Sequence, residues 1–520
     1  MKQEPLILTF DFGTQSVRAS IFDAKGECVA FAQEKYNPAY ESPKPGHAEL
    51  DPNYYYGCLC KCTKELAKNH AELLKQCKGI SLSCFRDTAV LLDKNNDVVR
   101  PTILWLDQRM AKCEDKLPLL SRAAFALVGM SEVIRVNRKR TAFNWIKENE
   151  PENYEKTAKY IAISTYFILK LTGKMVDSPS SYTGHYPIEY KKRAWYKNVE
   201  KHMQGSIFSI KQSQLCELVQ GGQICGTITK EAAAETGLPE GLVLYAGGSD
   251  KSCETLGTGV IDTSMAAISL GTACTIETST EKYVEPIPLL PAYPSVLPNL
   301  YNMDFQIYRG LWMINWFLKE FGGRQIDDLV VTESNPEDFN KHLLEIEPGC
   351  NGLFVQPYWG PLLDRPAVKG SIVGFTDSTT IYHVYKAIIE GIGYELRAAR
   401  DSFEKQLKKK TFKEIRISGG GAKSDAICQI MADIMNLPVT KIQTIEASSL
   451  GAAISGFMAI GLYKDAGEAV KAMVHPAKTF QPDPERVKVY DLLFKSVYVK
   501  LYGSLKKVYQ FIYDYQLKKI

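Results

Sequence analysis

The chain has 520 residues, of which 45% are hydrophobic and 23% charged, and its formal net charge is only +4. This length predicts two domains, because a single core rarely grows so large, and the small net charge without a basic cluster predicts no nucleic-acid partner. No apolar run approaches the ~18–20 residues of a membrane span, the start lacks a signal-peptide pattern, and thirteen scattered cysteines indicate reduced thiols, so a cytoplasmic protein with no membrane contact is expected.

The first predicted feature is a pair of strands at residues 6–10 and 17–22, joined by a turn that contains Gly13. The second strand alternates polar and apolar side chains, as a half-buried strand does, and Asp11 stands at the end of the first. A glycine turn exposes backbone N–H groups without side-chain bulk, which suits a phosphate. The sequence therefore predicts a phosphate-binding hairpin at the start of the chain.

Two short polar groups follow, each at the end of an apolar segment. A helix over about 54–77 precedes a strand at 79–83, and Arg86 and Asp87 come just after it. Arg offers paired donors and a carboxylate accepts from hydroxyls, so this pair is either a structural ion pair or a polyol clamp. In the next segment Trp105 is expected in the core, whereas Asp107 and Arg109 are expected to face a cleft.

The rest of the first half is predicted to be mainly helical before a polar loop. Helical patterns cover residues 121–128, 140–149 and about 154–171, the last ending at a Thr-Gly pair. The segment 177–186 is rich in Ser, Thr and Gly, and we expect it to be a loop that lies over another part of the molecule.

The stretch 242–276 contains the features around which the chain is organised. A strand at 242–246 ends at Gly247-Gly248, where we expect a sharp turn that leaves Asp250 at the strand's end. A second strand, Gly271-Thr272 and a third strand then predict another phosphate-type hairpin with a two-residue turn. The two hairpins lie 271 − 13 = 258 residues apart, close to half the chain, which suggests a duplicated architecture with a nucleotide between the halves.

The second half adds a further glycine-rich junction. Helices are predicted over about 310–321 and 381–407, the latter from its 3.6-residue apolar spacing, and a strand at 414–417 ends in Gly419-Gly420-Gly421 before another helix. Strand, glycines and helix form an arrangement that binds nucleotides, although neither a dinucleotide fingerprint nor a P-loop is present. A long loop at 358–366, a helix over 447–460 and a helical tail over 484–517 complete the chain.

Six motifs occur together in one order. They are Asp11-Phe12-Gly13-Thr14-Gln15-Ser16 with Arg18, Trp105-Leu106-Asp107-Gln108-Arg109, Gly247-Gly248-Ser249-Asp250, Gly271-Thr272, Gly419-Gly420-Gly421-Ala422 with Ser424, and Glu446-Ala447-Ser448-Ser449-Leu450-Gly451-Ala452-Ala453. In order and spacing the chain resembles the FGGY family of carbohydrate kinases over nearly all of residues 6–480. The resemblance implies an α/β fold of two lobes, actin/hexokinase/Hsp70-like (ribonuclease H-like), with a cleft between the lobes. It also implies an N-terminal domain at 1–258 for the sugar, a C-terminal domain at 259–480 for the nucleotide, and a helical tail at 481–520.

The resemblance further implies an enzyme that transfers a phosphoryl group from ATP to a hydroxyl of a small carbohydrate. Asp250 would be the catalytic base, because a carboxylate in reach of the hydroxyl aligns the attacking oxygen. Asp11, together with Asp250, would hold Mg²⁺, which keeps much of its hydration. The residues implied at the ATP and its phosphates are Gly13, Thr14, Gln15, Ser16, Arg18, Gly271, Thr272, Gly310, Asn315, Gly420, Gly421 and Ser424.

The acceptor is specified less narrowly. The implied substrate-binding residues are Arg86, Asp87, Trp105, Asp107, Asn137 and Lys251. Arg86-Asp87 stands where glycerol kinases carry an Arg-Glu pair. However, Lys251 stands in place of the Gln that is usual in glycerol kinases, and Asn137 falls near the position of an aromatic substrate contact in them. A ketopentose such as xylulose or a C4–C5 polyol is therefore the leading expectation. Glycerol, a signalling diol and a sugar acid are alternatives, the last with Lys251 or Arg109 as its cation, and a non-catalytic ATP-binding module is a further one. The sequence leaves a homodimer open.

Overall fold

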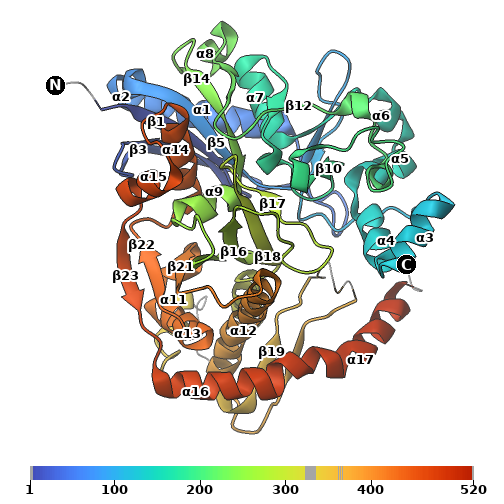
Figure 1. The fold of residues 1–520 in the computed structure, drawn as a ribbon, viewed down its shortest axis with the longest axis vertical. Helices are drawn as coiled ribbons and strands as arrows, with labels where there is room; N and C mark the ends of the chain where they lie inside the picture. Colours follow the sequence, from blue (N-terminus) through green and yellow to red (C-terminus); the bar gives the residue numbers. More distant parts are fainter. Residues whose placement is uncertain (1–3, 322–334, 361, 363–364, 366, 518–520) are drawn as a thin grey trace, which may run out of the picture.

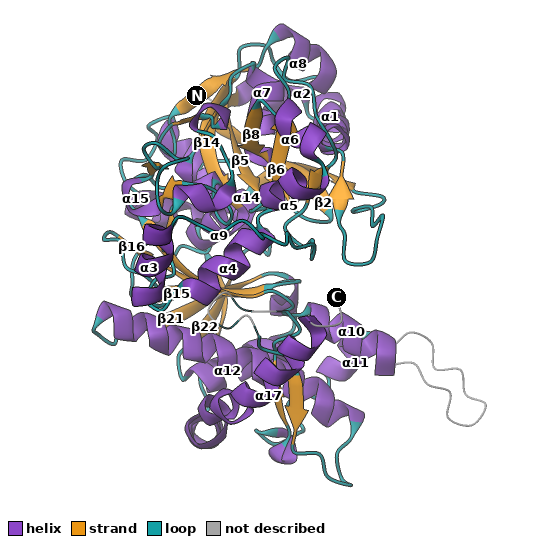
Figure 2. Ribbon diagram, turned by 90° about the vertical axis from the view of Figure 1, so that its right-hand side faces the viewer, coloured by secondary structure: helices purple, strands orange, loops and turns teal. Residues whose placement is uncertain are grey.

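The computed structural model describes residues 4–321, 335–360, 362, 365 and 367–517. The chain forms two lobes, each built around a mixed β-sheet with helices packed against it (Figure 1; Figure 2). The two-lobed α/β fold predicted from the sequence is therefore confirmed. Among the described helices, none combines the length and the apolar character that crossing a membrane requires.

The first lobe contains a six-stranded sheet in the order β13-β14-β5-β1-β2-β3. Its strands are β1 (Leu6–Phe12), β2 (Ser16–Phe22), β3 (Cys28–Lys35), β5 (Cys77–Cys84), β13 (Ile224–Thr227) and β14 (Val243–Ser249). β1 runs antiparallel to β2 and parallel to β5, and β14 runs parallel to β5. Every residue of β1 and β5 except Lys78 is buried, as expected for strands covered by helices on both faces.

The second lobe repeats this arrangement in a seven-stranded sheet of order β17-β18-β16-β15-β21-β22-β23. Its strands are β15 (Met265–Leu270), β16 (Cys274–Thr280), β17 (Tyr293–Pro294), β18 (Tyr301–Ile307), β21 (Glu414–Ser418), β22 (Val439–Ile442) and β23 (Pro476–Phe480). β15 pairs antiparallel with β16 and parallel with β21, just as β1 pairs with β2 and β5. The duplication inferred from the two glycine hairpins is thus present in the strand order.

Smaller sheets and the helices complete the lobes. The remaining strands are β4 (Glu49–Leu50), β6 (Ala89–Leu92), β7 (Thr102–Ile103), β8 (Lys159–Ala162), β9 (Val176–Asp177), β10 (Ile188–Glu189), β11 (Ala194–Trp195), β12 (Glu217–Leu218), β19 (Phe354–Gln356) and β20 (Ser371–Val373). The helices of the first half are α1 (Pro52–Asn69), α2 (Ala71–Gln76), α3 (Leu119–Leu127), α4 (Ser131–Arg140), α5 (Ala142–Asn149), α6 (Pro151–Lys156), α7 (Ile163–Thr172), α8 (Lys230–Thr236) and α9 (Asp250–Gly257). Those of the second half are α10 (Trp312–Phe321), α11 (Pro336–Asn340), α12 (Ile381–Leu407), α13 (Asp425–Met435), α14 (Ala447–Ala459), α15 (Ala466–Met473), α16 (Pro484–Leu493) and α17 (Val499–Leu517).

Two predicted helices are interrupted. The helix predicted over 154–171 consists of α6, strand β8 and α7, because Lys159–Ala162 pairs with β6 and extends the four-stranded sheet. The helix predicted over 54–77 breaks at His70, and Cys77 already belongs to β5. At Lys159–Ala162 and at Cys77, pairing in a sheet overrides the local helical pattern. In contrast, α12 has the predicted bounds of 381–407.

The lobes meet where α9 and α14 cross. α14 comes from the second half of the sequence but packs against β1, β5 and α9 of the first lobe. A Cβ on Gly451 of α14 would lie 1.8 Å from the Cys253 carbonyl oxygen of α9, and a Cβ on Gly257 would lie 1.8 Å from the Ala447 carbonyl oxygen. Only glycine permits such a close approach of two helices at both positions. The crossing therefore fixes α9 between the two sheets.

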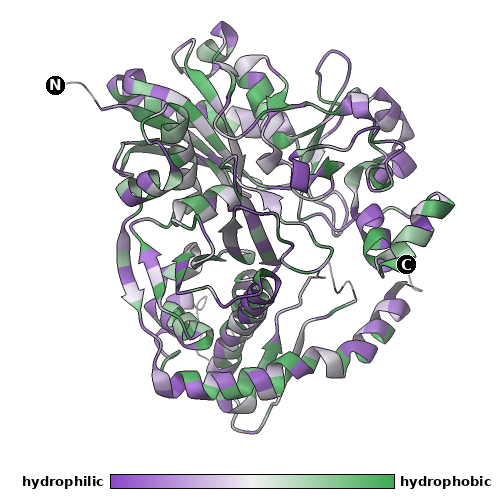
Figure 3. Ribbon diagram, in the orientation of Figure 1, coloured by the Kyte–Doolittle hydropathy of each residue, from purple (hydrophilic) through white to green (hydrophobic). Residues whose placement is uncertain are grey.

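The C-terminal helices pack on the second lobe. Tyr490 donates a hydrogen bond of 2.8 Å to Glu390 of α12, and Tyr498 donates one of 2.9 Å to Glu395 of the same helix. Both tyrosine side chains are buried. Both α16 and α17 mix hydrophobic and hydrophilic residues (Figure 3), and apolar side chains such as Leu492 and Phe511 remain exposed on them.

Candidate active site

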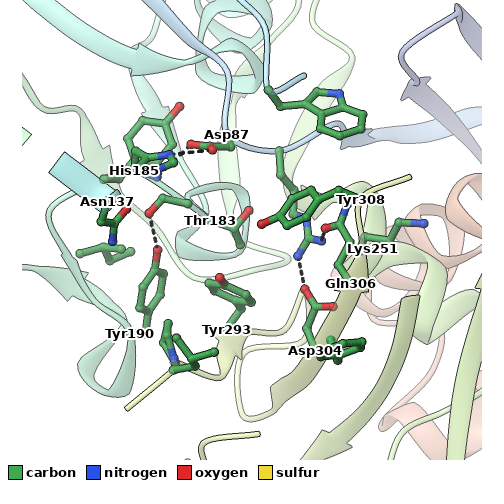
Figure 4. A pocket seen from close by; sticks show the side chains of 18 of the residues that line it. Asp87, Asn137, Thr183, His185, Tyr190, Lys251, Tyr293, Asp304, Gln306 and Tyr308 are labelled. Atoms are coloured by element: carbon green, nitrogen blue, oxygen red, sulfur yellow. Dashed lines mark hydrogen bonds and ion pairs between the residues drawn. The ribbon is translucent and has the colours of Figure 1, made fainter. Parts of the chain in front are cut away.

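A cavity of about 740 Å³ lies between the lobes and collects most of the predicted site residues. It is lined by the β1–β2 turn, residues 85–87 after β5, the start of α9, the β15–β16 turn, and parts of β17 and β18. Helix α4 and the segments 183–191 and 283–291 form further parts of its wall, and Figure 4 shows some of the lining side chains. Strand ends and turns of both sheets therefore face one space.

Asp250 lies on this cavity, at the first residue of α9. Its carboxylate accepts a hydrogen bond of 2.8 Å from the backbone N–H of Lys251 and lies 3.9 Å from Arg86 Nε. Burial raises the pKa of this carboxyl above its ordinary value of 3.8, although Lys251 and Arg86 act in the opposite direction. An acceptor hydroxyl in the cavity can therefore meet a carboxylate that is poorly solvated and held at a helix N-terminus.

The glycines before Asp250 do not form the predicted sharp turn. Gly247 and Gly248 belong to β14, which continues to Ser249 and shifts register between Tyr245 and Gly248. A Cβ on Gly247 would lie 1.9 Å from the Leu82 carbonyl oxygen of β5. These glycines therefore allow two strands to approach closely, and the change of direction occurs at Ser249, which caps α9.

Arg86 and Asp87 both line the cavity, but they do not pair with each other there. The guanidinium of Arg86 donates to Asp304 at 2.5 Å and to Gln306 at 2.9 Å, and both acceptors belong to β18 of the other lobe. Arg86 is thus an interlobe clamp. Neither Asp304 nor Gln306 could be singled out from the sequence, because they lie more than 200 residues away within a strand whose other residues are mostly buried.

Asp87 is held by His185, a residue that the sequence reasoning missed. Its two carboxylate oxygens accept from the His185 backbone N–H at 2.9 Å and meet the His185 Nδ1 at 2.8 Å. Although burial acts to raise the pKa of Asp87, the histidine lowers it below the ordinary value. His185 lies in the polar loop 177–186 that was expected to cover another part of the molecule, and a lone histidine there was the available signal.

Trp105 lies at the cavity and not in the core, in keeping with its place among the implied substrate-binding residues, whereas Asp107 lies outside the cavity lining. Trp105 lines the cavity, and its Nε1 donates to the Thr14 hydroxyl at 3.2 Å. The Asp107 side chain is instead buried in a network in which it accepts three bonds of 2.8 Å from Arg109, one of them from the backbone N–H, and one of 2.6 Å from the Ala48 backbone. Because Arg109 also pairs with Glu49 at 2.6 Å, neither charged residue reaches the cavity.

The two glycine hairpins meet in the cavity as predicted, and their turns are held by backbone hydrogen bonds. Gly13 N–H donates to the Ser16 carbonyl at 3.0 Å, and Gly271 N–H donates to the Ala273 carbonyl at 3.1 Å, so the second turn has three residues and not two. Cavity-lining members of the predicted phosphate set are Gly13, Thr14, Gln15, Ser16, Arg18, Gly271 and Thr272.

Arg18 lies between two acidic groups beside these turns. One of its terminal nitrogens is 3.2 Å from Asp11 and 3.2 Å from Glu446, the residue before α14. Burial raises the pKa of Asp11, while Arg18 lowers it. The described residues contain no group of three or more acidic, His or Cys side chains placed to hold a metal. One or two carboxylates suit Mg²⁺, which takes its remaining ligands from water and phosphates. Of the two predicted ligands, Asp250 lines the cavity, whereas Asp11 is buried beside Arg18 and is not among the lining residues.

Lys251 and Asn137 also line the cavity, from different elements. The Lys251 ammonium donates to Glu254 at 2.6 Å and to the Ser269 hydroxyl of β15 at 2.9 Å, and Glu254 in turn accepts from Ser418 of β21 at 2.6 Å. Lys251 therefore connects α9 to the second sheet. Asn137 lies on α4, at the side of the cavity away from Asp304 (Figure 4).

The remaining predicted nucleotide residues lie outside the cavity lining, which does not include Gly310, Asn315, Gly420, Gly421 or Ser424. Gly310 packs behind the second hairpin, where a Cβ would lie 2.4 Å from the Cys274 backbone nitrogen. Ser424 caps α13. Gly420 has open space around its Cα, whereas a Cβ on Gly421 would meet Leu270 and Leu311 beside the same hairpin.

Two lobes with the same strand order, and turns of both facing one cavity, define an actin/hexokinase-like ATPase architecture. Models of the FGGY family of carbohydrate kinases match residues 6–257 with the N-terminal domain and residues 266–460 with the C-terminal domain. The chain belongs to this family. It is accordingly a phosphotransferase whose acceptor is an alcohol group, and enzymes of this family use ATP.

Individual relatives are similar over nearly the whole chain but carry different names. The uncharacterized sugar kinase YgcE of Escherichia coli strain K12 is 28% identical over 514 residues, covering 97% of this chain and 95% of YgcE. The xylulose kinase of Lactococcus lactis subsp. lactis is 27% identical over 511 residues, covering 96% and 97%. A crystal structure of gluconate kinase from Lactobacillus acidophilus aligns with a TM-score of 0.81 and 23% identity, covering 98% of this chain and 100% of that one.

Proposed function

We propose that the protein transfers the γ-phosphate of ATP to a hydroxyl of an uncharged polyhydroxylated acceptor, a ketopentose such as xylulose or a C4–C5 polyol. The observation that carries this proposal is that Asp250 shares one cavity with Arg86 and Asp87 on one side and the Gly13 and Gly271 turns on the other. An acceptor held by the first group faces phosphates held by the second. The similarity to a xylulose kinase supports the same substrate class.

The charges around the acceptor position favour a neutral compound over a sugar acid. The carboxylates of Asp87, Asp250 and Asp304 line the cavity beside the guanidinium of Arg86 and the imidazole of His185, which pair with Asp304 and Asp87. The two cations that a sugar acid was expected to use are engaged elsewhere, because Lys251 pairs with Glu254 and Arg109 with Glu49 and Asp107. A further negative charge would be repelled here.

The residues act by position and charge. Asp250 aligns the acceptor hydroxyl and takes its proton as the new bond to phosphorus forms, and Arg86 and Asp87 hold neighbouring hydroxyls. Asp11 and Asp250 would hold Mg²⁺, which supplies charge to the transferring phosphate. Thr14, Arg18, Gly271 and Thr272 contact the phosphates.

We propose that the adenosine of ATP binds on the second lobe, beside the Gly271 hairpin. Its proposed contacts are Gly310, Asn315, Gly420, Gly421 and Ser424. The proposed domains remain 1–258, 259–480 and 481–520, although α14 packs on the first lobe.

The test is ADP release with D-xylulose, xylitol, ribitol, erythritol, glycerol and D-gluconate, measured for the wild type and Asp250→Asn. We expect turnover with one of the neutral acceptors, none with gluconate, and a kcat about 10²–10⁴-fold lower in the variant despite unchanged ATP binding. Preferred turnover of gluconate would refute the charge argument. ATP binding without ADP release for every acceptor would favour a non-catalytic module.

A further inference from the structure

The cavity extends well beyond the acceptor clamp into an apolar recess. Val133 and Ile134 of α4, with Met130 just before this helix, line it, and so do Ile207 and Phe208. Most residues of 286–291, a Pro- and Leu-rich stretch of the second lobe, line the same cavity. The recess therefore draws on both lobes, as the clamp does.

The floor of the recess is a built surface. Ile134, Ile207 and Phe208 are exposed by only 8%, 3% and 5%, so they are packed below while they face the cavity above. The Ile207 carbonyl accepts a 2.8 Å bond from the buried Asn144 amide, which fixes this turn under α4. The 286–291 stretch is anchored as well, because Ser402 of α12 donates to the Pro286 carbonyl at 2.9 Å.

Two aromatic side chains line the same cavity as the clamp and the apolar residues. Tyr190 and Tyr293 lie edge to face, with ring centroids 5.1 Å apart. Figure 4 shows Tyr190 near Asn137 and Tyr293 between Tyr190 and Asp304. Tyrosine presents an apolar ring with a polar tip, so such a pair suits a ligand whose polarity changes along its length.

The size of the cavity also favours a ligand larger than a pentose. Cavities of roughly 300–1,000 Å³ hold drug-sized ligands and are lined mainly by apolar and aromatic side chains with a few placed polar groups. At about 740 Å³ this cavity accommodates the transferring phosphate and a pentose-sized head with space left over. The space left over is the part with apolar walls, where hydroxyl groups would lose their hydrogen bonds to water without replacement.

We propose that the preferred acceptor is an amphipathic polyol, with hydroxyls at Arg86, Asp87 and Asp250 and an uncharged alkyl or aryl substituent in the recess formed by α4, Ile207, Phe208 and residues 286–291. This inference rests on the proposed kinase function and narrows its substrate class. The substituent contributes to the binding free energy because its apolar surface is removed from water, and the hydroxylated end determines which oxygen meets Asp250.

The experiment compares xylitol with its terminal mono-O-benzyl ether. Hydrophobic-pocket contacts of even one methylene change kcat/KM by about 10–200-fold, so we expect at least about a tenfold higher kcat/KM for the benzyl ether. Val133→Asp should lower the value for the ether at least about tenfold more than the value for xylitol. The matched control is Leu127→Asp on α3, where the side chain is 89% exposed and outside the cavity lining, and it should change neither.

Binding of the same two compounds, followed by the fluorescence of Trp105 at the cavity, separates this inference from the proposed reaction. If the ether binds more tightly than xylitol and Val133→Asp abolishes this difference, the recess is supported even if neither compound is phosphorylated. A lack of phosphorylation of both compounds would count against the proposed reaction alone. Equal or weaker binding and turnover of the ether, in wild type and variant alike, would overturn the inference and leave the polyol kinase in place.

Discussion

The close crossing of α9 and α14 makes Gly451 a sensitive test of how the base is positioned. A Cβ at this residue would lie 1.8 Å from the Cys253 carbonyl oxygen, whereas real Cβ contacts are not shorter than 3.0 Å, so a gap of at least 3.0 − 1.8 = 1.2 Å must open. The obstacle is backbone, so no side chain can rotate away. Because Asp250 lies three residues before Cys253 on the same short helix, Gly451→Ala displaces its carboxylate by a comparable distance.

A misplacement of about 1 Å at a reacting group lowers the rate about 10²-fold, and we expect this loss in kcat with the best acceptor. Overpacking should also destabilise the fold by about 1–3 kcal/mol, so circular dichroism, the thermal midpoint and ATP binding are measured on the same sample. Gly503→Ala in α17, where the added methyl meets nothing within 4 Å, is the control and should keep full activity. A folded Gly451→Ala enzyme with unchanged kcat would refute the view that this crossing positions the base.

The other predictions concern the charged groups of α9. Asp250→Asn should lower kcat by about 10²–10⁴-fold. It should also raise the thermal midpoint at pH 7: burial raises the pKa of Asp250, so the ionised carboxylate opposes folding as the pH rises through that pKa. A lower midpoint in the variant would contradict this reasoning. The acid limb of the pH profile of kcat/KM should lie above pH 3.8. Because Arg86 lowers the pKa of Asp250, Arg86→Gln should move this limb to higher pH. A shift to lower pH would count against Asp250 as the group that titrates. Lys251→Met should cost about 3–5 kcal/mol in urea unfolding, because it leaves the Glu254 carboxylate buried without its cation. The double variant with Glu254→Gln should recover most of that loss, and a fully additive double variant would show that the pair does not interact.

Local sequence patterns predicted the fold well where one side chain or one turn decides the outcome. The glycine hairpins, with Asp11 and Asp250 at strand ends, required only strand composition and glycine turns. The 381–407 helix required only its apolar spacing. Where two distant segments decide, the same reasoning failed. Gly247 and Gly248 look like a turn because close contact with the Leu82 carbonyl cannot be inferred from the glycines alone.

The acceptor side of the site was the least predictable part, and the reason is geometric. Arg86 was recognised, but its partners Asp304 and Gln306 belong to the other lobe. Asp107 carries the expected charge at a segment end, yet Arg109 two residues later closes a bidentate pair with it and removes both from the cavity. The pattern of residue types gives the charges present, whereas the partners that neutralise them depend on the tertiary structure.

The contacts of α9 explain why the base and the phosphate-binding turns should act as one unit. Its first residue, Asp250, lines the cavity, while Lys251, Glu254 and Thr255 contact Ser269, Ser418 and Glu277 of the second sheet. The second sheet also carries the Gly271 turn. A relative movement of the lobes therefore cannot shift the phosphate-binding turn without pulling on the helix that carries Asp250. In such an arrangement, alignment of the acceptor hydroxyl and closure of the lobes on the phosphates are the same structural event. In the open state, a water molecule therefore does not meet the Asp250 carboxylate and the bound phosphates at the same time.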